Sequence, residues 1–209
     1  VYCSSWDRVA GCADYGPVRS YFKRDETVVN DLLTDLDRRA RKGSRDERLA
    51  ALRQAARIPS PRSRPILERA MCDESPKVVE AALANLGFVA RDSRRELILN
   101  GLRCNSSTGG KLALMEKAEG WRHPRIWQEA RRLLKADPCR KVDKCKGKGC
   151  SAQAKLCAGA ARALGYSSNL ADAVLLAKFA DIKTKRVRRA ADRSLQTLLA
   201  MEDPPEGKK

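Results

Sequence analysis

The feature that most constrains the fold of this chain is a helical pattern that recurs at nearly constant intervals. Apolar residues recur three and four positions apart and nowhere alternate strictly, which predicts helices and no strands. Every second predicted helix begins near position 45, 76, 108, 151 or 184, so the steps are 31, 32, 43 and 33 residues. The sequence therefore predicts an all-α chain built from successive helical hairpins.

Local signals help to place the individual helices. Ser44 followed by Glu47, and Ser93 followed by Glu96, each match a capping box, in which a hydroxyl and a carboxylate satisfy backbone amides at a helix start. With the apolar periodicity, these signals predict helices over 26–41, 45–57, 63–72, 76–90, 94–104, 108–119, 124–136, 151–164, 168–180 and 184–200. The long step of 43 residues contains an insertion, DPCRKVDKCKGKGC, at 137–150.

Two distant stretches share one apolar skeleton. The segments VVEAALANL at 78–86 and VRRAADRSL at 187–195 both carry a valine, then an alanine pair, then a leucine at the ninth place. One helical hairpin cannot bury its apolar face alone, so hairpins stack, and small alanines let neighbouring helices approach closely. We expect the shared positions to face a neighbouring hairpin and the variable positions to face water.

The pattern x-P-x-V-x-x-A-A-x-x-x-L that ends at Leu86, its echo at 187–195 and the regular hairpin length resemble HEAT-type repeats of the short bacterial kind. The resemblance covers roughly 45–200. It implies a right-handed α-solenoid of about five stacked hairpins, which disulfides would staple together. An irregular helical bundle with the same local patterns is the alternative.

The chain divides into three parts on this interpretation. Residues 1–25 form an N-terminal segment that we expect a cysteine bridge to tie down, 26–200 form one repeat domain with the insertion at 137–150, and 201–209 form a flexible tail. No run of about 18 apolar residues is present, so we expect no membrane span. The chain begins at Val1 without a signal-peptide pattern, so we expect that a leader was removed or trimmed.

The eight cysteines favour disulfides over metal. They form an even set without a C-x-x-C pair, and the chain has one histidine. The candidates are Cys3, Cys12, Cys72, Cys104, Cys139, Cys145, Cys150 and Cys157. Oxidised cysteines would place the protein outside the reducing cytosol, in the periplasm or secreted.

The spacing of the cysteines suggests how they pair. Cys72 and Cys104 lie at matching ends of successive second helices, where a bridge is geometrically reasonable, with two packed free thiols as the alternative. Cys3 and Cys12 bracket a short segment that a local bridge would hold. The four cysteines from 139 to 157 fit poorly to the close pairs of a zinc site, so we expect two bridges there, with the pairing open.

The chain is strongly basic, with 43 Lys and Arg against 26 Asp and Glu and a formal net charge of +17. Such a charge attracts polyanions without specificity. Two basic stretches are the candidate sites for an anionic partner. The first holds Arg131, Arg132, Lys135, Arg140, Lys141, Lys144, Lys146 and Lys148. The second holds Lys185, Arg186, Arg189 and Arg193, whose three arginines fall on one helical face, opposite Val187, Ala190 and Leu198. The alternative is a solvated basic surface.

No catalytic motif is recognisable at the spacing that known mechanisms require. His123 is a weak candidate for catalysis, because it can equally cap the helix that begins at Pro124. Trp121 and Trp127 flank it and either anchor a partner or pack in the core. We expect no catalytic residue, cofactor or metal.

The sequence therefore predicts a non-catalytic adaptor that offers a basic surface to an acidic protein or a cell-envelope polymer. Nucleic-acid binding through phosphate contacts is the alternative. A third possibility, a DNA glycosylase, rests only on the resemblance, since some HEAT-like proteins have that activity and fold does not transfer function. The partner's identity and the oligomeric state stay open.

Overall fold

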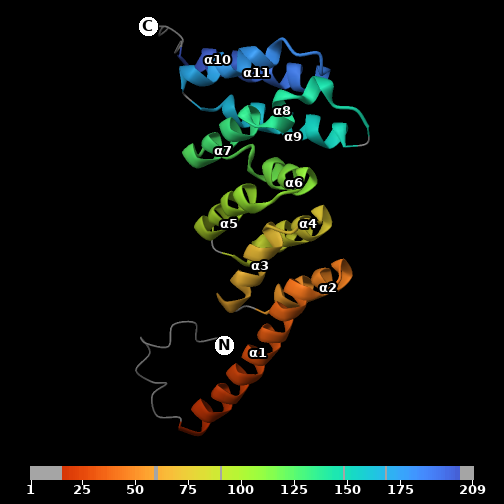
Figure 1. The fold of residues 1–209 in the computed structure, drawn as a ribbon. Helices are drawn as coiled ribbons and strands as arrows, with labels where there is room; N and C mark the ends of the chain where they lie inside the picture. Colours follow the sequence, from red (N-terminus) through yellow and green to blue (C-terminus); the bar gives the residue numbers. More distant parts are fainter. Residues whose placement is uncertain (1–15, 59–60, 90, 148, 168, 203–209) are drawn as a thin grey trace, which may run out of the picture.

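The computed structural model describes residues 16–58, 61–89, 91–147, 149–167 and 169–202 (Figure 1). Over these ranges the chain forms helices and no strand, which confirms the predicted all-α class. The α-helices are α1 (Gly16–Lys42), α2 (Arg45–Ala55), α3 (Arg64–Met71), α4 (Pro76–Ala84), α5 (Arg91–Cys104), α6 (Thr108–Ala118), α7 (Pro124–Lys135), α8 (Asp137–Arg140), α9 (Cys150–Leu164), α10 (Leu170–Ala180) and α11 (Lys185–Glu202). Short 3-10 turns, η1 (Pro61–Ser63), η2 (Asn85–Phe88) and η3 (Val142–Lys144), complete the set.

The structure departs from the predicted helix boundaries in three places. Helix α1 begins at Gly16, so it extends into the segment that the sequence separated as 1–25. The helix predicted over 76–90 is split into α4 and η2, and the insertion is a folded element containing α8 and η3. The capping box at Ser44 is confirmed by hydrogen bonds in both directions with Glu47. The box at Ser93 is wrong, because α5 begins at Arg91 and Ser93 lies inside its first turn.

The helices pack in an ordered stack (Figure 1). Helices α2, α4, α6, α9 and α11 form one row in which each helix contacts the next, and α3, α5 and α7 form a second row beside it. Helix α10 packs on α11, whereas α1 contacts α2 and α3 at the other end and runs outward from the stack. The helices of the first row are those whose starts define the repeated steps in the sequence.

The shared apolar skeleton lies where helices of the first row meet. Val78 on α4 is 2% exposed and Val187 on α11 is 0% exposed, and both alanine pairs lie against the core. The expectation that variable positions face water is wrong at Val79 and Ser194, which are also buried. A helix of the first row packs both against its row neighbours and against a second-row helix or α10, so it buries a wider face than one interface requires.

Buried hydrogen bonds fix the register between two successive hairpins. The Asn105 amide donates to the backbone oxygens of Met71 and Asp73, at 3.0 and 2.8 Å. The Asn105 side-chain oxygen accepts from the Ser107 amide at 2.8 Å, and the Asp73 carboxylate accepts from the Ser75 amide at 2.8 Å. Both are turns in which a side chain caps the backbone two residues on, so the same device recurs in both hairpins.

Three disulfides are present in the described part of the chain. Cys72 pairs with Cys104, as the sequence predicts, with a Cα to Cα distance of 5.3 Å. In the insertion, Cys139 pairs with Cys157 and Cys145 pairs with Cys150, which resolves the pairing that the sequence left open. The predicted bridge between Cys3 and Cys12 lies outside the described residues. None of the helices in the described ranges is long and apolar enough to cross a bilayer.

Candidate anion-binding groove

A cationic groove lies between α9 and α11. Its volume is about 430 Å³, and its lining residues are Arg162, Lys185, Arg186, Arg189, Ala190 and Arg193. Five of the six residues are cations and none is acidic, although Glu119, which lies outside the lining, pairs with Arg162. We call this set of residues the α11 groove.

The sequence of α11 explains how its arginines reach this groove. Val187 and Ala191 are buried against neighbouring helices, so positions three and four apart on the other side of α11 turn outward. Arg186 and Arg189 are exposed there. Ala190 is 6% exposed and lines the groove floor, so it lies beneath the arginine row, whereas the sequence analysis placed it opposite that row.

Arg162 is a groove residue that the sequence analysis did not select. Its guanidinium donates two hydrogen bonds to one carboxylate oxygen of Glu119 on the loop after α6, at 3.0 and 2.6 Å. This ion pair orients Arg162 over the junction between α9 and α11. Lys155 lies seven residues earlier, on the same face of α9, and lines a smaller cavity of about 150 Å³ with Arg162, Arg186 and Glu116. The seven-residue spacing of Lys155 and Arg162 is a signal that the sequence analysis overlooked.

The two arginines at the start of the first predicted stretch form ion pairs with carboxylates of the same chain. Arg131 forms a two-pronged ion pair with Asp172 on α10, at 2.5 and 2.8 Å, and the Asp172 side chain is 2% exposed. These hydrogen bonds raise the pKa of the Arg131 guanidinium above its usual range, although partial burial opposes the shift. Arg132 pairs with buried Glu129 at 2.7 Å. Neither arginine lines the α11 groove.

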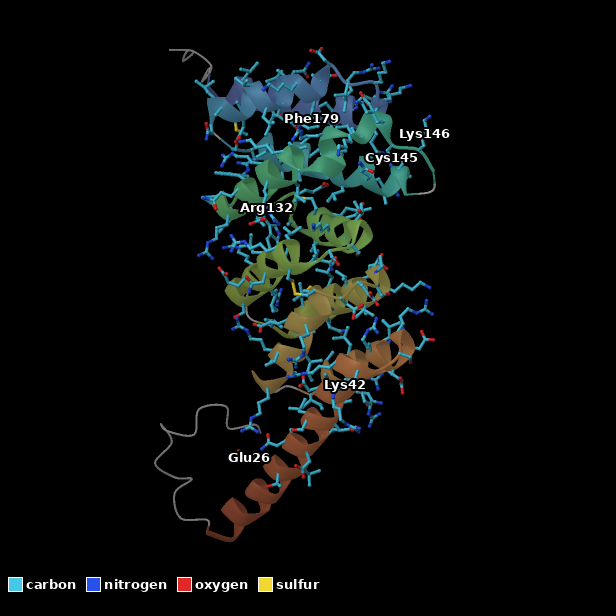
Figure 2. The ribbon with its side chains drawn as sticks, in the orientation of Figure 1. Glu26, Lys42, Arg132, Cys145, Lys146 and Phe179 are labelled. Carbon is cyan, nitrogen blue, oxygen red and sulfur yellow. A yellow bond between two sulfur atoms is a disulfide. The ribbon has the colours of Figure 1, made fainter. Side chains whose placement is uncertain are left out.

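The other described cations of the first stretch lie at the end of α7 and in the insertion, and none of them lines the α11 groove. Lys135 ends α7, Arg140 ends α8, and Lys141, Lys144 and Lys146 follow, all of them exposed, whereas Lys148 lies outside the described residues. Figure 2 shows Arg132 and Lys146 toward opposite sides of the stack. The first predicted stretch therefore does not form one continuous surface.

Asp143 docks the insertion onto the start of α11. Its carboxylate accepts from the backbone amides of Lys183 and Thr184, both at 2.8 Å, and from the Thr184 hydroxyl at 2.6 Å. Desolvation would raise the pKa of Asp143, but these hydrogen bonds and the Lys183 charge together hold it below 3.8. The insertion thereby lies next to Lys185, at one end of the groove.

His123 serves as a helix cap. Its Nδ1 accepts from the backbone amide of Arg125 at 3.3 Å, at the start of α7. Trp121 and Trp127 are both half-buried against the core, which supports the packing interpretation for much of their surface. Among the described residues, no group of three or more His, Cys, Asp or Glu side chains has a geometry that could hold a metal ion.

Comparisons of the chain with protein-family models, with curated proteins and with solved structures found no match.

Proposed function

We propose that this protein is a non-catalytic α-solenoid adaptor that binds an acidic segment of another protein along the α11 groove. The observation that carries the proposal is the groove lining, which holds five cations and no acidic residue, and of these five Arg162 is paired with Glu119. Four of those cations are arginines, whose planar guanidinium groups bind carboxylates through paired hydrogen bonds.

The solenoid interpretation is supported by the order of contacts along the stack. Hairpins that follow one another in sequence contact one another in space, and the Asp73 and Asn105 turns repeat with a step of 32 residues. The Cys72–Cys104 bridge joins the ends of α3 and α5, two equivalent helices. These features are ones that HEAT-like repeats would have and so support the proposal of a solenoid, and we take its right-handed twist from the resemblance alone. The three disulfides support an extracytoplasmic location.

The groove lining favours an acidic polypeptide over a single-stranded nucleic acid. No aromatic side chain lines the groove, and proteins that bind single strands use aromatic rings on which bases stack. A DNA duplex needs only phosphate contacts, so it is the competitor that the experiment must separate.

The test compares two neighbouring arginines on one helix. Arg189 lines the groove and Arg188 does not, although both are exposed on α11. Arg189→Gln and Arg188→Gln remove the same charge, so they separate the groove from the overall charge. The triple variant Arg186→Gln/Arg189→Gln/Arg193→Gln amplifies the effect, and Arg53→Gln/Arg57→Gln/Lys77→Gln is its control, at exposed positions on other parts of the stack.

Binding is measured by fluorescence anisotropy with labelled poly-glutamate, with labelled duplex DNA and with heparin as a competitor, over a range of salt concentrations. Each exposed ion pair contributes about 0.5 kcal/mol, so loss of three weakens poly-glutamate binding by roughly tenfold. If the triple variant and its control lose the same affinity for poly-glutamate, net charge alone accounts for the binding, and the proposal of a specific groove is wrong. If the protein binds the duplex more tightly than poly-glutamate, and only the groove variant loses that binding, the partner is a nucleic acid and not an acidic polypeptide.

A further inference from the structure

A second and larger hollow lies at the loops that join α4 to α5 and α6 to α7. Its volume is about 720 Å³, which is within the range of small-molecule sites, about 300–1,000 Å³. Residues from η2, the start of α5, the end of α6 and the loop before α7 line it. We call it the loop pocket. Of its lining residues, the sequence singled out Trp121 and His123 but did not predict that they share a pocket.

The charged part of the loop pocket is entirely cationic. Arg94, Arg95, Lys117 and Arg122 line it, and no acidic residue does. Arg94 has a structural role, because it donates to the backbone oxygens of Val89 and Gly87, at 2.5 and 2.9 Å. Lys117 and Arg122 are exposed and are the cations best placed to meet a ligand.

Arg122 is oriented by an aromatic ring. Its guanidinium carbon lies 5.2 Å from the centre of the Tyr166 ring, which belongs to the loop between α9 and α10. At this distance the cation interacts with the face of the ring through its charge, an interaction that leaves guanidinium N–H groups available to an anion. The ring thereby holds a ready donor at the rim of the pocket.

His123 offers a second hydrogen-bond donor, its Nε2–H. Its Nδ1 accepts from the Arg125 amide, so the neutral ring carries its proton on Nε2. His123 lines the pocket, so its Nε2–H is the ring donor that a ligand there could use. The His123 ring therefore caps α7 with its Nδ1 and can donate to a ligand with its Nε2.

The remaining walls are apolar. Trp121 is half-buried and packs against the core, and Leu83 and Leu86 lie on the α4 side of the pocket. A planar apolar group that enters the pocket would stack on Trp121 and pack against the two leucines.

We propose that the loop pocket binds a small organic anion with a flat, apolar body. Lys117, Arg122 and the His123 Nε2–H would hold the anionic group, and Trp121 with Leu86 would hold the body. This site shares no lining residue with the α11 groove, so it stands even if the groove binds nothing.

The probe is anilinonaphthalenesulfonate, an aromatic anion whose fluorescence rises on binding, and the uncharged N-phenylnaphthylamine is its control. The chain has one histidine, so the His123 ring protons give a local NMR signal for occupancy of the pocket. We expect the anion, and not the uncharged compound, to bind at one site and to shift the His123 signals. Equal binding of both compounds, or binding that leaves His123 unchanged, would overturn the proposal.

A charge variant tests whether the exposed cations of the pocket bind the probe. Lys117→Gln/Arg122→Gln removes the two exposed cations, and Arg57→Gln/Lys77→Gln is the control of equal charge. We expect the first to weaken the probe at least tenfold and the second to change affinity less than twofold. Loss of the same size in both would overturn the proposal.

Gly120→Leu adds bulk to the lining of the pocket without a change of charge. A Cβ added at Gly120 meets nothing within 4 Å, and Gly120 lines the pocket, so the side chain enters open space. Gly149→Leu is the matched control in another loop, where a Cβ also meets nothing within 4 Å. We expect Gly120→Leu to abolish the His123 shift while the circular dichroism spectrum stays that of the parent. A folded Gly120→Leu variant that still binds would contradict the site.

Discussion

The disulfide between Cys72 and Cys104 provides a quantitative test of how the hairpins are held together. Both cysteines have access to solvent, Cys104 as an exposed and Cys72 as a half-buried residue. In the double variant Cys72→Ser/Cys104→Ser the new hydroxyls therefore reach water, and no buried polar group is left unpaired. The variant loses the cross-link and little else.

The magnitude follows from the length of chain that the bridge closes. Cys72 and Cys104 are separated by 32 positions, which corresponds to about 3.7 kcal/mol of unfolding free energy in the loop-entropy model. The bridge between Cys145 and Cys150 spans 5 positions, which corresponds to about 2.2 kcal/mol. Its removal as Cys145→Ser/Cys150→Ser is the matched control, since both of these cysteines are also half-buried.

Urea unfolding followed by circular dichroism measures both variants, and a free-thiol assay verifies that the remaining bridges are intact. We expect the Cys72/Cys104 variant to lose about 1.5 kcal/mol more than the control, and its midpoint of thermal unfolding to fall by about 7–15 °C. Hydrogen exchange should accelerate first in α3 and α5, which the bridge joins. Equal losses in the two variants, or a loss below about 1 kcal/mol in the first, would refute the entropic account.

Three further predictions concern individual contacts. Asp172→Ala leaves the Arg131 charge and the buried Ser167 hydroxyl without their partner and should destabilise the fold by about 3–5 kcal/mol in urea unfolding, whereas Arg131→Met/Ser167→Ala/Asp172→Leu should recover much of that loss. Gly165→Ala places a Cβ 2.9 Å from the Ser194 backbone and should cost about 1–3 kcal/mol in the same assay; no loss would mean that α9 and α11 can separate without penalty. The pKa of Asp143 is depressed in the folded state, so its contribution to stability is present above pH 3.8 and is lost as the pH falls through the lower folded value. An Asp143→Asn variant should therefore lose part of the pH dependence of unfolding in that acidic window, and an unchanged profile would contradict the docking role.

The sequence alone determined where most helices lie and which of their faces are buried. These properties depend on neighbours within one or two turns, such as the Ser44 and Glu47 cap and the apolar spacing around Val78. The Cys72–Cys104 pair was also predictable, because equal positions in successive hairpins must lie close together once the hairpins stack. Local signals failed at Ser93, because α5 begins at Arg91, three residues before the predicted start at 94.

Only the tertiary structure decided which charges remain available to a partner. Arg131 and Arg186 look alike in sequence, yet Arg131 pairs with an aspartate 41 positions away, whereas Arg186 lines an open groove. Arg162 was missed for the same reason. The sequence singled out Trp121 and His123 but could not show that they share a pocket with residues of another hairpin. An ion pair or a pocket depends on the distance between side chains of different helices, and that distance is set by the way the hairpins stack and not by the spacing within any one of them.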